Sequence, residues 1–288
     1  MSSREQGTLY LCATPIGNLE DVTLRVLRTL KEADLIAAED TRRTRKLLAH
    51  YGIHTRLVSY HEHNRRSRGD QILALLQAGK QVALVTDAGL PGISDPGEEI
   101  AARALAEGIK VVPLPGPNAA LTALAASGLP AARFSFEGFL PVQPAARKER
   151  LQSLTEETRT LIFYEAPHRL QRTLQDLLAV LGDRKIAVAR ELTKVHEEVW
   201  RGSLSAALAY FQNPRGEFTL VVAGAKKQKT AAPEKPVSRA AIAEKVRTLE
   251  AGGKDRREAL KEAARQLKLK RRDVYTALVQ TKAGKSTP

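Results

Sequence analysis

The stretch VALVTDAGLPGISDPG, residues 82–97, decides the fold that the rest of the chain must match. Its first four residues, Val82–Val85, form an uninterrupted apolar run, which is typical of a short strand buried in a sheet. The next twelve residues hold three glycines, two prolines and two aspartates. This composition indicates a backbone that turns sharply and closely approaches a neighbouring group, such as a ligand. The stretch therefore predicts a buried strand that ends in a binding loop.

Short apolar runs alternate with helical patterns through the first half of the chain. Between the runs, apolar residues recur at the spacing of one helical face, as Val22, Val26 and Leu30 do. Strands separated by helices favour a largely parallel sheet with helices on its faces. We therefore expect an N-terminal α/β domain over residues 8–127. Its predicted strands are Thr8–Ala13, Asp34–Ala38, Thr55–Ser59, Val82–Thr86 and Val111–Leu114.

Strand patterns follow one another more closely in the second half. The segment from Val188 through Trp200 to Ser203 predicts a hairpin, so a mixed sheet fits better here. Ser-Gly-Leu-Pro at residues 127–130 is typical of a domain boundary, which gives a second α/β domain over residues 128–225. Its predicted strands are Phe134–Leu140, Thr160–Tyr164, Lys185–Glu191, Glu197–Gly202 and Glu217–Val222.

Positive charge is concentrated at the C-terminal end. The 288 residues carry a formal net charge of +14, and residues 226–288 hold 18 Lys and Arg against 7 Asp and Glu. Polar, proline-containing composition predicts a flexible linker at residues 226–237. Residues 238–281 predict a basic helical module, with Ser238 and Asp273 as helix caps. A basic appendage on a nearly balanced body is typical of a nucleic-acid binder, and a solubilising tail is the alternative.

Composition argues against several classes of protein. The chain is 43% hydrophobic, but no apolar run approaches the ~20 residues of a membrane span, and the N-terminus does not resemble a secretory signal. The one cysteine, Cys12, stands in an apolar run and can form no internal disulfide. His61 and His63 flank Glu62, but this spacing on a loop is weak metal-site geometry, so we predict no metal. We expect a cytoplasmic protein with no membrane partner.

Polar or glycine- and proline-rich segments follow each of the first five predicted strands. Because the carboxyl ends of parallel strands meet at one edge of a sheet, these loops should converge on one rim, where ligands bind. No G-x-G-x-x-G or G-x-x-x-x-G-K-[ST] motif occurs, so neither a dinucleotide nor a triphosphate cradle is indicated. The loops suit a small organic cofactor held by backbone groups, with Asp87 as a hydrogen-bond acceptor. They are Thr14–Asn18, Glu39–Thr44, Tyr60–Asn64, Thr86–Gly97 and Pro115–Ala119.

Seven ordered motifs carry a resemblance to a known family. They lie between residue 8 and about residue 224 and read LYLCATPIGNLEDVTLRVLRTL, AEDTRRTRKLL, TDAGLPGISDPG, PGPNAALTALAASGLP, FYEAPHRL, ARELTKVHEE and GEFTLVV. In this order they resemble the tetrapyrrole methylase family of S-adenosylmethionine-dependent methyltransferases, in its branch that acts on ribosomal RNA. The resemblance implies two α/β domains with the cofactor in the cleft between them, in a homodimer. It also implies 2′-O-methylation of a cytidine ribose in the decoding region of 16S ribosomal RNA, with the 30S subunit or its RNA as partner.

The resemblance further implies which residues meet S-adenosylmethionine. The first loop, often glycine-rich in relatives, reads Ala13–Asn18 here, and Ile16 stands where a hydrophobic residue touches the cofactor. Each implied residue also has a plainer reading as turn, cap or core. The implied cofactor-binding residues are Ile16, Asp87, Leu90, Pro115, Gly116, Tyr164 and Ala189.

Methyl transfer requires the protein to orient the nucleophile and exclude water. We expect the stretch after the second strand to face RNA rather than cofactor, because consecutive arginines suit phosphates; a solvated helix face is the alternative. The predicted substrate-binding residues are Glu39, Asp40, Arg42 and Arg43. A general base near the ribose hydroxyl would assist, and the sequence does not choose among the candidates. They are Glu39, Asp40, His61, Glu62, Glu165, His168 and Glu191.

Two other functions stay open at this point. A methyltransferase of a tetrapyrrole or other small molecule would have a similar body, but the basic tail would then have no purpose. A non-enzymatic RNA-binding sensor would need no catalytic base and should show no turnover.

Overall fold

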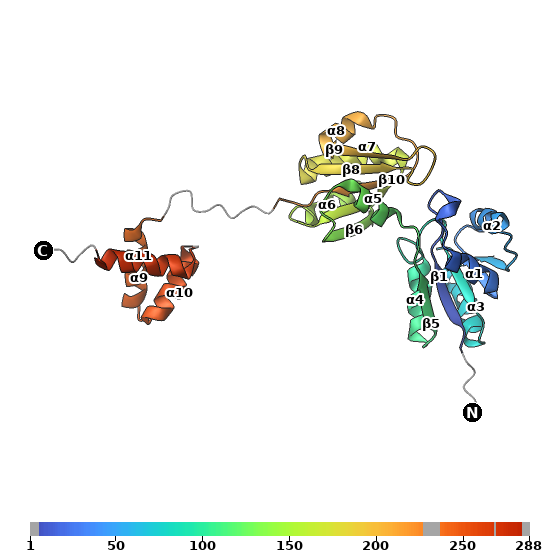
Figure 1. Ribbon diagram of the computed structural model, residues 1–288, viewed down its shortest axis with the longest axis horizontal. Coiled ribbons are helices and arrows are strands. Elements are labelled where there is room, and N and C mark those ends of the chain that lie inside the picture. The colour runs from blue at the N-terminus through green and yellow to red at the C-terminus, as the bar shows by residue number, and fades with distance from the viewer. Residues whose placement is uncertain (1–5, 227–236, 268, 284–288) are drawn as a thin grey trace, which may run out of the picture. The chain divides into compact units, whose positions relative to one another are not determined.

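The computed structural model describes residues 6–226, 237–267 and 269–283 (Figure 1). The chain divides into two compact units, residues 1–226 and 227–288, and each is described by itself. Among the described residues, no helix has both the length and the apolar character needed to cross a bilayer.

The first sheet of unit 1 is entirely parallel, as predicted. Its strands lie in the order β3-β2-β4-β1-β5. The central strand is β4, with which the stretch of residues 82–97 begins. All five carboxyl ends therefore point to one edge. The strands are β1 (Thr8–Cys12), β2 (Leu35–Ala38), β3 (Leu57–Ser59), β4 (Val82–Val85) and β5 (Lys110–Leu114), within two residues of the predicted bounds.

Helices cover both faces of this sheet. The apolar side chains of α1 (Leu24–Glu32) and α2 (Thr41–His50) pack on one face, and those of α3 (Arg65–Gln77) and α4 (Gly97–Ala106) on the other. Neighbouring residues of β4 alternate between these two cores: Leu84 joins the α3 side and Val85 the α2 side. A strand buried on both faces explains the uninterrupted apolar run in the sequence.

The second sheet of unit 1 is mixed, as predicted. Its order is β6-β7-β10-β8-β9; β6 and β7 are parallel, and the other pairs are antiparallel. The predicted hairpin is confirmed, with Ala189 paired to Val199 across it. The strands are β6 (Phe134–Phe139), β7 (Thr160–Glu165), β8 (Lys185–Arg190), β9 (Glu198–Ser203) and β10 (Phe218–Val222).

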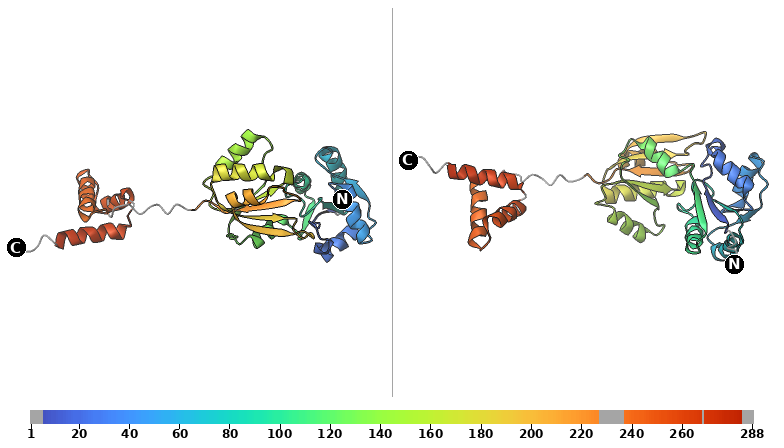
Figure 2. Two further views of the ribbon diagram at one scale, coloured as in Figure 1. Left: turned by 90° about the horizontal axis from the view of Figure 1, so that it is seen from above. Right: turned by 60° about the horizontal axis from the view of Figure 1, so that its bottom comes forward.

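Helices lie on both faces of this sheet (Figure 2), and side chains along its strands alternate between the two faces. Leu161 and Phe163 of β7 pack with α6 (Pro144–Ser153), α7 (Pro167–Leu181) and α8 (Leu204–Tyr210). Ile162 and Tyr164 face the other way, toward α5 (Ala119–Ser127), which contacts four strands of this sheet. Helix α5 precedes the predicted boundary at residues 127–128 but packs on the second sheet, so it joins the two domains.

In the described part of unit 2, residues 237–267 and 269–283, three short helices form a bundle: α9 (Arg239–Ala251), α10 (Arg256–Gln266) and α11 (Arg271–Ala283). Ser238 caps α9 as predicted, with its hydroxyl oxygen accepting from the Ala241 amide at 3.2 Å. The prediction that Asp273 caps the third helix is wrong: α11 begins two residues earlier, so Asp273 lies within its first turn. Most of the predicted linker, residues 227–236, lies outside the described residues.

Candidate functional site

A cavity of about 460 Å³ opens where the two α/β domains of unit 1 meet. Its walls come from the carboxyl ends of β1, β2 and β4, the start of α5, the ends of β6, β7 and β8, and the start of β10. The third predicted loop contributes none of the described lining residues, so the expected convergence of five loops is only partly right. Strand β3 lies at the edge of the sheet opposite β5, whose loop does line the cavity. Glu62, in the loop after β3, lines a neighbouring hollow of about 670 Å³ instead.

The loop after β4 is held in shape by its own backbone and by the loop after β1. Thr14 and Gly89 exchange two backbone hydrogen bonds, of 2.8 and 3.0 Å. Gly89 has φ +85°, a conformation that glycine adopts without strain. The Asp95 carboxylate accepts from the amides of Gly92 at 2.9 Å and Gly97 at 2.7 Å. The loop predicted from composition is therefore pre-shaped.

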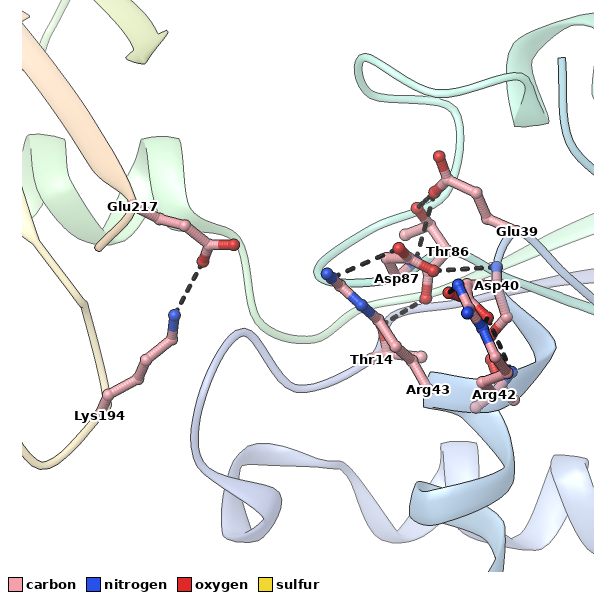
Figure 3. A network of polar contacts seen from close by, with 10 residues as sticks. Thr14, Glu39, Asp40, Arg42, Arg43, Thr86, Asp87, Lys194 and Glu217 are labelled. Carbon is pink, nitrogen blue, oxygen red and sulfur yellow. Dashed lines mark hydrogen bonds and ion pairs between the residues drawn. The ribbon is translucent and has the colours of Figure 1, made fainter. Parts of the chain in front are cut away.

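A polar network ties the ends of β2 and β4 together at one side of the cavity (Figure 3). The hydroxyl of Thr86 donates to Oε2 of Glu39 at 2.8 Å. The backbone amide of Asp40 donates to Oδ1 of Asp87 at 2.9 Å, and Oδ2 of Asp87 lies 3.4 Å from Nη1 of Arg43. Both carboxylates are thereby fixed in position by protein donors.

The pKa values of two carboxyl groups in this network are shifted in opposite directions. Burial, and then the nearby charge of Glu39, raise the pKa of Asp87 above its usual value. The hydrogen bonds from Arg42 lower the pKa of Asp40 to about 2. The charges of Glu39 and Asp87 therefore repel each other, and a bound cation would relieve this repulsion.

The second domain supplies an apolar wall. Burial raises the pKa of the Tyr164 phenol, and the nearby backbone amide of Ala120, at the start of α5, acts in the opposite direction. The Phe139 ring lies 5.6 Å from the Tyr164 ring, centroid to centroid. Ile16, Ala189 and their neighbours form a cluster that continues from the first domain into the second. Flat apolar groups of a ligand would find contacts here.

The structure brings most of the predicted site residues together. Five predicted cofactor residues line the cavity: Ile16, Asp87, Leu90, Tyr164 and Ala189. Glu39 and Arg43 also line it, and Asp40 and Arg42 lie directly beside it in the network. Pro115 and Gly116 are not among the described lining residues; Asn118 and Ala119 of the same loop are.

The candidates for the general base differ in whether they line the cavity and in whether their oxygens already have hydrogen-bond partners. His61, Glu62, His168 and Glu191 are absent from the described cavity wall. Glu165 lines the cavity, but its oxygens are occupied by the Thr173 hydroxyl at 2.6 Å and the Ala166 amide at 2.9 Å. Glu39 also lines it, and among the described residues its Oε1 has no hydrogen-bond partner.

Several wall residues escaped sequence reasoning. Glu217 lies just before β10 and Thr219 within it, and β10 begins at the edge where its antiparallel neighbours β7 and β8 end. Only the strand order would have placed them there. Phe139 could have been found, because it stands at the end of a predicted strand. On the second-domain side, Glu217 pairs with Lys194 at 2.9 Å (Figure 3).

The chain matches known proteins along most of its length. The family described as Tetrapyrrole (Corrin/Porphyrin) Methylases matches residues 8–208. A protein named ribosomal RNA small subunit methyltransferase I from Synechocystis sp. is 51% identical over 280 residues, covering 96% of this chain and 99% of that one. Its namesake from Bacillus subtilis is 50% identical and covers 95% of this chain and 94% of its own. The fold also matches a crystal structure of diphthine synthase, with a TM-score of 0.58 at 16% identity, over 75% of this chain and 90% of that one.

Proposed function

The chain belongs to the family of tetrapyrrole (corrin/porphyrin) methylases, and on that premise we propose that it is an S-adenosylmethionine-dependent methyltransferase of ribosomal RNA. It methylates the 2′-oxygen of a cytidine ribose in the decoding region of 16S ribosomal RNA. One observation carries this: the Synechocystis relative matches 96% of the chain, so the likeness extends from the catalytic body into the basic helical module. The name of both relatives does not favour a tetrapyrrole or other small molecule as substrate.

The cavity suits S-adenosylmethionine in size and in charge. Its volume of about 460 Å³ lies within the usual range of ligand pockets, about 300–1,000 Å³. Among its described lining residues five side chains are acidic and one, Arg43, is basic, and Glu39 and Asp95 are the acidic ones without an ion pair there. The bound cofactor supplies a methyl group carried on a cationic sulfur, and the acidic wall stabilises that charge. The residues that hold the cofactor are Ile16, Asp87, Leu90, Tyr164 and Ala189, with Pro115 and Gly116 supporting the first loop.

The close packing at Gly116 supports the proposed role of the loop after β5. A Cβ atom at residue 116 would lie 2.7 Å from the Cβ of Ala13, closer than such atoms approach. Glycine there lets the loops after β1 and β5 pack against each other beside the cavity. The pair Pro115-Gly116 thus positions other loops rather than forming the cavity wall.

Glu39 is the residue we assign as general base. Its Oε2 is fixed by the Thr86 hydroxyl at 2.8 Å, which leaves Oε1 to accept from a substrate hydroxyl. When the bound cofactor supplies its methyl group to the ribose oxygen, Oε1 of Glu39 would take the proton of that hydroxyl and then release it to solvent. Base assistance of this kind accelerates a reaction by roughly 10²–10⁴-fold.

The cations beside Glu39 face the RNA. Arg42 is 84% exposed and pairs with Asp40 at 2.8 Å, while Arg43 is 63% exposed and pairs with Asp87. An ion pair this exposed contributes little to stability. A phosphate of the RNA can therefore replace the carboxylate as the partner of the guanidinium. We also propose that the protein is a homodimer, as the family resemblance implies. We place it in the cytoplasm because its proposed substrate is ribosomal RNA.

The test is methyl transfer from labelled S-adenosylmethionine to small ribosomal subunits and, separately, to naked 16S RNA. We expect label in RNA, mapped by nuclease digestion to one cytidine in the decoding region and retained on its ribose. Label on a base, label only in ribosomal protein, or no transfer to either substrate would contradict the proposed function.

A further inference from the structure

The basic helical module contains a groove whose lining is dominated by arginine. Its volume is about 500 Å³. The lining residues come from the first turns of α10 and α11 and are Arg256, Arg257, Leu260, Arg271, Arg272 and Tyr275. Two helix N-termini, with their partial positive charge, thus open beside four guanidinium groups.

These four guanidinium groups have no ion-pair partner among the described residues. By contrast, Arg265 on the same helix α10 pairs with Glu262 at 2.7 Å. Asp255, Glu258 and Asp273 stand near the same two turns, but none of them is among the residues lining the groove. The groove therefore presents concentrated and unneutralised positive charge, which complements a polyanion.

The groove also has an apolar side, which a site for phosphate alone would not need. Tyr275 is 58% exposed, and Leu260 forms part of the lining. An exposed aromatic ring beside arginines is the arrangement on which single-stranded nucleic acids stack a base. In a duplex the base faces are already stacked on each other, so only the arginines would be used.

The catalytic cavity gives an independent reason to expect such a surface elsewhere in the chain. Among its described lining residues five are acidic and one, Arg43, is basic, and three of the carboxylates are ion-paired, so the wall offers phosphates few cationic partners. The affinity for RNA must therefore come mainly from surfaces outside the cavity.

We propose that the groove between the first turns of α10 and α11 binds a single-stranded segment of the RNA substrate, with phosphates on its arginines and one nucleobase stacked on Tyr275. The inference rests on the proposed function only for the identity of the RNA. It assigns the groove a share in substrate affinity and none in the chemical step.

The experiment measures binding of a labelled short single-stranded RNA, and of an RNA duplex, to the full chain by fluorescence anisotropy at several salt concentrations. The double variant Arg256→Ala/Arg271→Ala should bind single strands about 10-fold more weakly. Its log–log salt slope should be smaller in magnitude by about 1.4, since each lost contact contributes about 0.7 on single strands. The matched control is Arg239→Ala/Arg247→Ala, which removes two exposed arginines of α9 that lie outside the groove lining.

Tyr275→Leu separates stacking from charge. It should weaken single-strand binding by about 5- to 100-fold, leave the salt slope unchanged and leave duplex binding unchanged. All substituted side chains are exposed, so circular dichroism should show unaltered helix content.

Three outcomes would overturn the inference: no binding of single-stranded RNA by the unmodified chain, equal losses in the groove variant and the α9 control, or an unaltered affinity in Tyr275→Leu. Failure of the proposed function is a separate result, because binding is measured without methyl donor. A chain that binds RNA through the groove but transfers no methyl group would refute the proposed function alone.

Discussion

Substitution of Glu39 by glutamine tests the assignment of the general base. Glutamine keeps an oxygen that can accept from the Thr86 hydroxyl, which lies 2.8 Å from Oε2 of Glu39, so the local hydrogen bonding is retained. The amide cannot take a proton from the ribose hydroxyl. We expect kcat to fall by about 10²–10⁴-fold, which corresponds to roughly 2.7–5.4 kcal/mol of barrier at 1.36 kcal/mol per tenfold.

The assay is single-turnover methyl transfer with enzyme in excess, together with calorimetric titration of the cofactor. Cofactor affinity in Glu39→Gln should change by less than about 10-fold, because one charge of several in the wall is lost. The matched control is Glu217→Gln, which removes a carboxylate from the second-domain side of the cavity, where it pairs with Lys194. We expect the control to keep kcat within about 3-fold of the unmodified enzyme.

Two results would refute this reasoning. A kcat for Glu39→Gln within about 3-fold of the unmodified enzyme, with the cofactor still bound, would show that proton transfer does not depend on Glu39. A loss of cofactor binding of more than about 100-fold would instead make Glu39 a cofactor residue.

The remaining predictions concern substrate contact, linkage and folding. Arg42→Ala should raise KM for RNA several-fold and leave cofactor affinity unchanged; lost cofactor binding in a titration would contradict its placement toward RNA. Because the pKa of Asp87 is raised in the folded state, its carboxyl stabilises the fold increasingly as pH falls through the raised value toward the usual one. Melting curves should therefore show the unmodified chain gaining stability relative to Asp87→Asn on acidification, and a constant difference would count against it. Burial raises the pKa of Cys12 to about 12, so iodoacetamide should label this thiol at mildly alkaline pH only after unfolding, and rapid labelling of the native chain would show that it is not buried. Phe163→Ala should destabilise unit 1 by about 3–5 kcal/mol in denaturant titrations, because its ring is 1% exposed in the core; a loss below about 1 kcal/mol would show that this core is poorly packed.

Strand periodicity predicted most of the fold because it reports burial directly. The uninterrupted run Val82–Val85 belongs to a central parallel strand, and the closely spaced runs around Trp200 belong to an antiparallel hairpin. The predicted cap at Asp273 failed for a local reason. The arginines of residues 271–272 are themselves good helix formers, so α11 starts before the capping side chain.

The site is predictable from the sequence only where strand ends determine it. Ile16, Asp87 and Leu90 follow parallel strands, and the rule that such ends share one edge is enough to place them together. The prediction for the third loop is wrong because nothing in the sequence shows that β3 and β5 lie at opposite edges of the sheet; the loop after β5 leads into α5, which packs on the second sheet, and the loop after β3 lies at the other edge. Glu217 escapes prediction for the same reason, since strand order is set by long-range pairing rather than by local pattern.

The most direct test of the central claim is a crystal structure with S-adenosylhomocysteine, the product left after methyl transfer. The account predicts the ligand in the cavity of about 460 Å³, with its sulfur near Asp87 and Leu90 and its adenosine against Tyr164 and Ala189. A ligand bound elsewhere, for example in the hollow of about 170 Å³ lined by Thr14, Lys46 and Leu47, would contradict it.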